Sequence, residues 1–330
     1  MDTISSMDTM TEEEEVLQIL EKGSIKEHLS QRLKNAPQVM LSGHRITIEI
    51  EELDEFYIQK AKEELRETPE IVAQSIKELK ELIAGEINVR ITDTDEFYTI
   101  FLRCCKWHAQ KAFSLMKAIC LFRQNYPHIC TNLKPSRQKE ALCSGLIYPM
   151  PLRNQDGSRI FVIEIGKRWK PKQISLDQIF IGLLLCTAAA TMEPKTQVAG
   201  GHVIIDLEGL SLSQVSYFSP SFAKMVTDFI QTALPCRLKS INIVNQSFLF
   251  NVVFALFKPF LQEKLRKRIH FHGTNRQSLM AYVDKSALLK KHGGELDATD
   301  DSFGVNLWQL FCTFDSFFII LNHLGYINKV

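Results

Sequence analysis

Four short runs of β-branched and aliphatic residues, bounded by glycine, asparagine or charged residues, follow Pro135. The runs are residues 159–166, 201–209, 239–245 and 267–273. The helical patterns between them are residues 175–192, 220–233 and 248–267. Runs of this kind are typical of strands, and strands separated by helices of this length indicate βαβ crossovers. The sequence therefore predicts an α/β fold with a largely parallel sheet.

The part of the chain before Pro135 is mostly helical in pattern. The predicted helices are residues 11–23, 55–65 and 68–86, with two more within residues 91–127. For the third of these, Thr68 can cap the first turn and Pro69 can occupy it. Residues 44–50 alternate like a strand, but no partner strand is evident.

These patterns divide the chain into four parts. They are a flexible tail at residues 1–10, a helical domain at 11–133, an α/β domain at 134–300 and an amphipathic closing helix within 301–330. Residues 1–100 carry 23 acidic and 11 basic side chains, whereas the remaining 230 carry 15 and 28. This asymmetry indicates surfaces that meet different partners. The formal net charge of +1 does not call for a nucleic-acid partner.

The cysteines show no spacing typical of a metal site. They are Cys104, Cys105, Cys120, Cys130, Cys143, Cys186, Cys236 and Cys312. Free thiols and an acidic N-terminus without an apolar signal core favour the cytoplasm. The longest near-continuous apolar run, residues 248–257, is about half the length that a membrane-spanning helix requires. We therefore expect a soluble protein.

Motifs for phosphate binding and for a nucleophile elbow are absent from the sequence. Asp206 and Glu208 share one face of a strand end, where two carboxylates could act as acid and base. Alternatively, they cap the next turn and pair with basic neighbours. We favour this second interpretation because no nucleophile or metal set accompanies them. The chain is predicted to have no catalytic residue and not to be an enzyme.

His270 and His272 lie on one face of the last predicted strand. Two imidazoles at this spacing could bind a metal, but no third ligand is evident. We expect instead that Ile269 and Phe271 face one side of the sheet and that the histidines meet a helix or polar groups on the other side. No metal and no cofactor are predicted, although a bound hydrophobic ligand is.

The stretch "FKPFLQEKLRKRIHFHG", residues 257–273, joins an apolar run to a basic cluster. Pro259 should break the helix near Lys258. Residues 248–257 are apolar around nearly the whole helix, so that helix must be covered on most sides. It could be a core helix, or it could cover a lipid-filled cavity and also meet a membrane.

A second short helix should follow Pro259, with Glu263 and Lys267 as an i, i+4 pair. Lys264, Lys267 and Arg268 fall close to one face of it. That face could simply be solvated, or it could bind anionic lipid at about 1 kcal/mol per basic residue. Nucleic acid is less favoured because no recognised fold or stacking motif joins the basic residues.

Several stretches carry a family resemblance. They are "FLRCCKWHAQKAFSLM", "TQVAGGHVIIDLEGLSLSQVSYFSPSFAKMV", "SINIVNQSFLFNVVFALFKPFLQEKLRKRIHFHG" and "LLKKHGGEL". Together they resemble the CRAL-TRIO family, in the branch of the α-tocopherol transfer protein, the retinaldehyde-binding proteins and their insect relatives. The resemblance covers roughly residues 50–300 in the same order.

The resemblance implies a helical N-terminal domain and then a lipid-binding domain. In that domain a mixed five-stranded sheet and its helices enclose an apolar pocket, which a mobile helix closes. It implies carriage of one tocopherol-, retinoid-, carotenoid- or other terpenoid-like molecule and no catalysis. Tocopherol-type members also recognise phosphoinositide head groups with a basic patch beside this gate helix.

Carried over by position, the resemblance implies a gate helix at residues 248–257, with Phe250, Val253 and Leu256 as its outward contacts. The implied gate residues are Phe250, Val253, Phe254, Leu256 and Phe257. The implied phosphoinositide or anionic-lipid residues are Lys106, Arg237, Lys264, Lys267 and Arg268. Cys105 stands where the family's "FLRAR" has its second arginine. Lys106 lacks a guanidinium fork, so anionic attraction is expected more firmly than phosphoinositide selectivity.

The resemblance also implies which residues line the pocket. They are Phe180, Leu183, Thr187, Gly201, Phe229, Ile230, Leu238 and Ile241. The Thr187 hydroxyl could orient the polar end of a ligand in an otherwise apolar cavity. Small residues nearby either enlarge the cavity or permit close packing of helix and sheet. They are Gly182, Ala188, Ala189, Ala190 and Gly201.

The sequence and the resemblance together predict a monomeric, cytoplasmic lipid-transfer protein. Its predicted partners are a hydrophobic small molecule and, reversibly, an anionic or phosphoinositide-containing membrane surface. Two alternatives stay open. One is exchange of phosphatidylinositol or phosphatidylcholine. The other is a protein-interaction module that uses the acidic N-terminal helices and retains the pocket as a relic.

Overall fold

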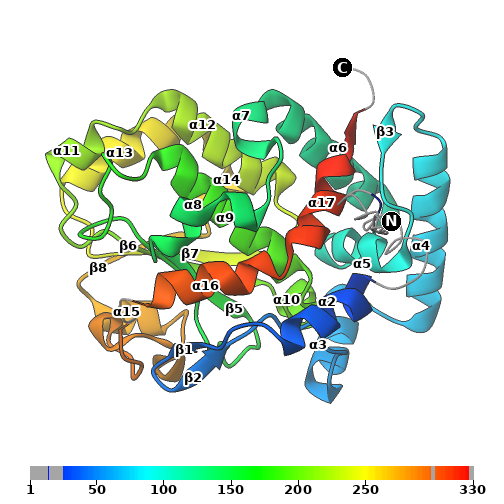
Figure 1. Cartoon of the computed structure of the whole chain (residues 1–330), viewed down its shortest axis with the longest axis horizontal. Coiled ribbons are helices and arrows are strands. Elements are labelled where there is room, and N and C mark those ends of the chain that lie inside the picture. The colour runs from blue at the N-terminus through cyan, green and yellow to red at the C-terminus, as the bar shows by residue number, and fades with distance from the viewer. Residues whose placement is uncertain (1–13, 15–24, 299–301, 327–330) are drawn as a thin grey trace, which may run out of the picture.

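The computed structural model describes residue 14, residues 25–298 and residues 302–326. The predicted tail at residues 1–10 and the predicted helix at residues 11–23, apart from Glu14, lie outside the described residues. A β-sheet occupies the middle of the molecule, and the helices α4 (Pro69–Ala84), α5 (Asp95–Cys104) and α6 (Ala109–Asn125) stand at one end of it (Figure 1).

The central sheet has the strand order β4-β5-β6-β7-β8. Its strands are β4 (Ile147–Pro149), β5 (Arg159–Glu164), β6 (Gly201–Asp206), β7 (Leu238–Val244) and β8 (Ile269–Gly273). Strands β5 to β8 pair in parallel, and β4 is an antiparallel edge strand. The predicted α/β fold with a largely parallel sheet is confirmed. Strand β4 was not predicted, because three residues that end in a proline show no strand period.

Helices fill the connections between these strands, as the spacing predicts. The main ones are α9 (Leu176–Thr191), α10 (Pro194–Ala199), α11 (Leu212–Val215), α12 (Pro220–Asp228), α13 (Leu249–Phe257) and α14 (Glu263–Arg266). Helix α9 begins at a capping box of Ser175 and Gln178. Helix α13 ends at Phe257 and continues as a 3₁₀ turn, η3 (Lys258–Phe260), so the break predicted at Pro259 is present.

Shorter elements complete this part of the chain. They are α7 (Pro127–Cys130), η1 (Pro135–Arg137), α8 (Lys139–Cys143), η2 (Phe229–Ala233), α15 (Arg276–Met280), η4 (Lys285–Ala287) and η5 (Lys290–His292). The element η2 is a single π-helical turn that extends α12. Before β6, the backbone of Gly200 has a φ of 78°, and a Cβ there would lie 2.1 Å from the Arg237 carbonyl oxygen. Only glycine fits this close approach of two segments.

The helical part before the sheet contains four helices that the sequence pattern predicted, α3 (Glu55–Leu65), α4, α5 and α6, and one that it did not, α2 (Ile25–Lys34). The Thr68 hydroxyl accepts a hydrogen bond from the Ile71 backbone N–H, so the predicted cap of α4 is confirmed. The segment without a predicted partner forms β2 (His44–Ile46), which pairs with β1 (Val39–Leu41) as an antiparallel hairpin.

The predicted single closing helix is instead two helices. They are α16 (Phe303–Cys312) and α17 (Asp315–His323), which meet at 56°. The Asp315 carboxylate, at the start of α17, accepts the Ser136 backbone N–H at 3.0 Å and ties the bend to η1. After α17, β9 (Gly325–Tyr326) pairs with β3 (Val89–Arg90). Over the described residues, α16 and α17 meet the length and hydropathy requirements for a bilayer span as a bent pair, and no single helix meets them alone.

One continuous core holds the helical part and the α/β part together, and it includes Leu29, Leu102, Ile160, Leu185 and Phe318. A second, smaller cluster lies beneath α13 and α14 and consists of Leu207, Ile241, Ile243, Leu261 and Leu265. Helix α13 therefore packs on a cluster that is separate from the main core. The domain boundaries that the sequence indicated stay predictions.

Candidate ligand cavity and the surface beside it

A cavity of about 230 Å³, the main cavity, lies between one face of the sheet and helices α9, α12 and α13. Alternate residues of the strands supply its floor, because successive side chains of a strand point to opposite faces. These floor residues include Phe161, Ile163, Val203, Ile205 and Ile243. Val203 and Ile205 are partly exposed although β6 is a central strand, because their side chains face this empty space.

All eight residues that the sequence and resemblance assigned to the pocket line the main cavity. They are Phe180, Leu183, Thr187, Gly201, Phe229, Ile230, Leu238 and Ile241. Sequence reasoning missed much of the floor, including Phe161, Val203 and Ile205. The signal was present, since residues 161, 163 and 165 and residues 201, 203 and 205 follow the strand period of two.

The small residues divide between the two roles considered. Ala190 and Gly201 line the main cavity. Gly182 instead permits close packing, because a Cβ there would lie 3.2 Å from the Ala141 carbonyl oxygen. Ala189 is buried outside the cavity lining, and Ala188 lines a second, smaller space.

Polar groups are sparse in the lining of the main cavity. The Thr227 hydroxyl donates to the Ala223 carbonyl at 2.8 Å, so its helix satisfies it. Burial raises the pKa of the Cys236 thiol to about 12, so that side chain is neutral. The Thr187 hydroxyl has no hydrogen-bond partner among the described side chains and backbone groups. Thr187 can therefore bond to a ligand without losing a bond within the protein.

Helix α13 covers one side of the main cavity. Val253, with 3% of its surface exposed, lines the cavity together with Phe250, Phe254 and Phe257. The expectation that Phe250 and Val253 face outward is therefore wrong, because this face of the helix closes over the sheet. Leu256 is partly buried and lies outside the lining. The ring of Phe254 meets that of Phe271 on β8, with ring centroids 5.1 Å apart.

The outer face of α13 is apolar and exposed. Phe248 is 78% exposed and Val252 is 55% exposed. Helix α11 packs against α13, and its Leu212 is 71% exposed. We call Leu212, Phe248 and Val252 the apolar patch. Helices α11 and α13 lie at one end of the molecule, away from α4 (Figure 1).

Basic side chains lie close to α14. Lys264 is exposed, and its charge helps to lower the pKa of the Cys105 thiol. The largest cause of that lowering is a hydrogen bond from Cys104, and Lys111 contributes as well. Lys264 of α14 and Lys111 of α6 therefore both lie near Cys105. Sequence reasoning missed Lys111, because nothing in the pattern indicates that it and Lys264 both lie near Cys105.

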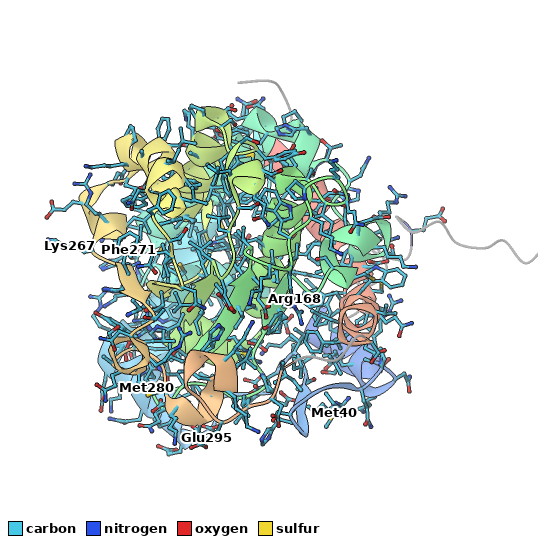
Figure 2. The ribbon with its side chains drawn as sticks, turned by 90° about the vertical axis from the view of Figure 1, so that its left-hand side faces the viewer. Met40, Arg168, Lys267, Phe271, Met280 and Glu295 are labelled. Carbon is cyan, nitrogen blue, oxygen red and sulfur yellow. The ribbon has the colours of Figure 1, made fainter. Side chains whose placement is uncertain are left out.

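The other predicted anionic-lipid residues differ in their surroundings. Lys106 is exposed, and Lys267 forms the predicted ion pair with Glu263 at 2.7 Å. Figure 2 shows Lys267 pointing away from the molecule on the side that also carries Phe271. Arg268 is partly buried, and its backbone carbonyl accepts the Ile241 N–H at 2.7 Å. We call Lys106, Lys111, Lys264 and Lys267, together with Arg268, the basic patch.

Arg237 does not offer a free guanidinium to this patch. Its Nη2 donates to Glu64 at 2.7 Å, and its Nη1 donates to the Val198 carbonyl. Glu64 also pairs with Lys60 at 2.7 Å and Lys239 at 3.5 Å. Arg237 therefore joins α3 to the start of β7. The expectation that Arg237 binds lipid did not take account of its pairing with Glu64, which is 173 residues away in the sequence.

The pairing of Glu64 with Arg237 predicts that the stability of the fold depends on pH. Burial raises the pKa of Glu64, but hydrogen bonds from Lys60 and Arg237 outweigh it and lower the pKa to about 2. A carboxylate with a depressed folded-state pKa contributes stability above its unfolded pKa, near about 4.3, and loses it as the pH falls. The difference in melting temperature between wild type and Glu64→Gln should therefore shrink between about pH 5 and about pH 2. A difference that stays constant over this range would contradict the assignment.

Asp206 and Glu208, the two carboxylates considered for acid–base chemistry, both bind other groups of the protein. Asp206 accepts hydrogen bonds from His292 Nε2 at 2.9 Å, Asn245 Nδ2 at 2.8 Å and the Glu208 backbone N–H at 3.0 Å. Burial raises the pKa of Asp206, but these hydrogen bonds lower it well below its ordinary value. Glu208 is exposed and pairs with Lys167. Asp206 and Glu208 therefore cap a turn and pair with basic neighbours.

The two histidines of β8 lie on the face away from the main cavity, whereas Ile269 lines it. His272 bonds to Ser278 at 2.7 Å and to Asn242 at 3.1 Å. His270 stacks on Tyr282, with ring centroids 4.1 Å apart. Within the described ranges, no three His, Cys, Asp or Glu side chains gather as metal ligands.

The geometry defines a carrier-like site, with an apolar cavity under a short apolar helix. A sequence model of the CRAL/TRIO domain matches residues 144–294, which contain the sheet and the main cavity. A relative that covers 80% of this chain shares 32% identity with it. The chain therefore belongs to the CRAL/TRIO family of lipid-binding and transfer proteins.

The relatives include proteins of two kinds. An alpha-tocopherol transfer protein-like protein of Pongo abelii is 32% identical over 277 residues, which are 80% of this chain and 81% of that protein. Clavesin-1 of Mus musculus is 32% identical over 248 residues, which are 74% of this chain and 69% of that protein. The crystal structure of Sfh5 covers 77% of this chain and 96% of that chain, with 12% identity and a TM-score of 0.38.

Proposed function

We propose that the chain carries one hydrophobic, terpenoid-like molecule in the main cavity and exchanges it at anionic membrane surfaces. The observation that supports this most directly is the lining of the main cavity, which is apolar except for Thr187, Thr227 and Cys236. The transfer of apolar surface from water into such a cavity is favourable by about 25 cal/mol per Å². No charged side chain stands in that lining to meet a phospholipid head group, which favours a ligand that is apolar over most of its length.

In this proposal α13 is the gate. It packs on the small cluster beneath it, which is separate from the main core, so its movement would leave the main core in place. Pro259 in η3 and the segment at Asn245, where φ is 56°, are the candidate hinges. The apolar patch would enter the bilayer surface while the basic patch binds anionic head groups. The protein would act in the cytoplasm as a monomer that binds membranes reversibly.

The ligand itself provides the test. Recombinant full-length chain, extracted with organic solvent after purification, is expected to release one class of hydrophobic molecule in near-stoichiometric amount, identified by mass spectrometry. Release of phosphatidylinositol or phosphatidylcholine would replace the terpenoid-like ligand with a phospholipid. Extracts that are consistently empty, combined with failure to take up retinol or tocopherol from vesicles, would contradict the proposal.

The electrostatic step makes a separate prediction. Lys264→Glu combined with Arg268→Glu should slow transfer of a fluorescent ligand from anionic vesicles by about tenfold or more at low salt, since each basic residue near the surface is worth about 1 kcal/mol. The matched control is Lys62→Glu combined with Lys77→Glu, two exposed lysines of α3 and α4. Equal transfer rates for both double variants would exclude the basic patch from membrane binding.

A further inference from the structure

A second cavity, of about 110 Å³, adjoins the main cavity. It lies between α5, α6, α9, η2 and α17. Thr187 and Phe229 line both cavities, so the two spaces meet at these side chains. A ligand in the main cavity would reach the second cavity only past these two side chains.

Aromatic rings form the wall between the two cavities. The ring of Phe229 lies 5.4 Å from that of Phe122 and 5.6 Å from that of Phe180, measured between centroids. Phe229 is the first residue of the π-helical turn η2. Such turns occur frequently at functional sites, because they displace one side chain from the regular helix. Rotation of the Phe229 ring would widen the passage.

The second cavity has a cation in its wall. Arg123 Nη2 donates to Asn322 Oδ1 at 3.3 Å, and Asn322 Nδ2 donates to the Leu133 carbonyl at 3.0 Å. The second bond holds the amide with its oxygen toward Arg123. Within residues 25–298 and 302–326, no carboxylate lies within 4.0 Å of the guanidinium. Burial lowers the pKa of Arg123, as expected for a cation withdrawn from water without a counter-ion.

The groups nearest to Arg123 do not supply a negative charge. Burial raises the pKa of both Cys120 and Cys130 to about 11, so their thiols are neutral. Arg123 is partly buried. A charge withdrawn from water is costly unless it is paired, and a guanidinium pairs best with a carboxylate, which accepts two parallel hydrogen bonds. A single cation in a small, mostly apolar cavity suits a compact monoanion better than a phosphodiester head group, which would lack further polar partners.

We propose that the second cavity receives the carboxylate end of a ligand whose apolar chain lies in the main cavity, with Arg123 as its ionic partner. The ligand class is therefore a long-chain or isoprenoid carboxylic acid. Asn322 is a positioning residue, because it orients the guanidinium. This inference rests on the proposed carrier function and specifies the chemistry of its ligand.

The test compares two probes with the same chain, oleic acid and oleyl alcohol. On delipidated full-length protein, the acid should bind about tenfold more tightly than the alcohol near neutral pH, because hydrogen bonds to charged groups contribute about 1.5–3 kcal/mol. Arg123→Gln should remove this preference, and Arg123→Lys should retain part of it. Arg137→Gln, an exposed arginine of η1 outside both cavities, is the matched control and should keep the preference.

A second measurement does not depend on the variants folding. Oleic acid labelled with ¹³C at the carboxyl group should titrate at a lower pH in the wild-type protein than in neutral phosphatidylcholine vesicles, because a nearby guanidinium favours the carboxylate. Equal binding of the two probes by wild type, an acid preference that survives Arg123→Gln, or an unshifted titration would overturn this inference alone. Failure of both probes to bind would overturn the carrier function itself.

Discussion

Glu193→Gln is expected to lower the free energy of unfolding by about 3–5 kcal/mol, the typical cost of removing one partner from a buried ion pair. Glu193 and Arg159 are 1% and 2% exposed, and the two side chains pair directly. Glu193 also accepts a hydrogen bond from Arg153 Nη2 at 2.9 Å. Glutamine has the same shape but no charge, so the variant would leave two arginines with one carboxylate partner, Glu49, which is 22% exposed.

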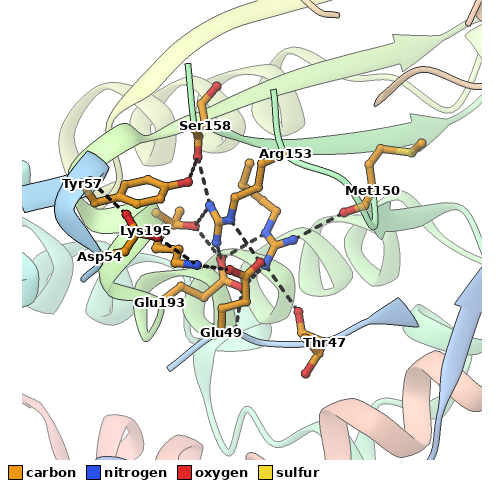
Figure 3. A network of polar contacts seen from close by, with 12 residues as sticks. Thr47, Glu49, Asp54, Tyr57, Met150, Arg153, Ser158, Glu193 and Lys195 are labelled. Atoms are coloured by element: carbon orange, nitrogen blue, oxygen red, sulfur yellow. Dashed lines mark hydrogen bonds and ion pairs between the residues drawn. The ribbon is translucent and has the colours of Figure 1, made fainter. Parts of the chain in front are cut away.

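The remaining partners show why this loss should be large. Figure 3 shows Arg153 beside Glu49 and Glu193, and Arg159 pairs with the same two carboxylates. Glu49 accepts from Arg153 Nε at 3.1 Å and from Arg159 Nη2 at 3.0 Å. Burial raises the pKa of Glu193, but the charges of Arg159 and Arg153 lower it by more, so the carboxyl stays charged in the fold. In the network, the two arginines are therefore balanced by the two glutamates.

The network also joins parts of the chain that are far apart in sequence. Glu49 follows the β1–β2 hairpin, Arg159 begins β5, and Glu193 precedes α10. Its loss should therefore release the segment around Glu49 first. Chemical denaturation measures the free energy, and hydrogen exchange of residues 46–50 should increase in Glu193→Gln. Glu208→Gln is the matched control, because Glu208 is exposed and a surface ion pair contributes about 1 kcal/mol or less. Similar losses in the two variants would contradict this assignment.

The hydrophobic pattern predicts the sheet, and the same period of two would have found the cavity floor, because burial acts on every second residue of a strand. Val203 and Ile205 follow the same period as Gly201, which the resemblance had already assigned to the pocket. The pattern cannot place α13 in the same way. A helix that is apolar on nearly all sides has no preferred face in its sequence. The outward role of Val253 came from the resemblance alone, and it was wrong because Val253 lines the main cavity.

Charged side chains are less predictable because their partners lie far along the chain. Arg237 meets Glu64, and Arg159 meets Glu49, across more than a hundred residues. Arg123 is a related case. In the sequence it is a basic residue in the last turn of a helix, where it would simply favour the helix dipole. Its place in the wall of a cavity follows only from the packing of α17 against α6 and α9.

Filling the main cavity should abolish ligand carriage while the protein stays folded. Val203→Trp places an indole on the cavity floor, between Phe161 of β5 and Ile241 of β7, which pair with Val203 across the sheet. The variant should retain about tenfold less ligand than wild type or none, because the indole and the ligand compete for one cavity of about 230 Å³. Val305→Trp, the same change at an exposed residue of α16, should retain ligand as wild type does.

The melting temperature gives a second measure of whether the main cavity is occupied. A bound ligand stabilises the folded state in proportion to the logarithm of its concentration over its dissociation constant, so delipidation should lower the melting temperature of wild type and of Val305→Trp. Val203→Trp should show no such change, because its cavity is already filled. If Val203→Trp still yields ligand on extraction and still loses stability on delipidation, the ligand binds elsewhere, and the main cavity is not the site of carriage.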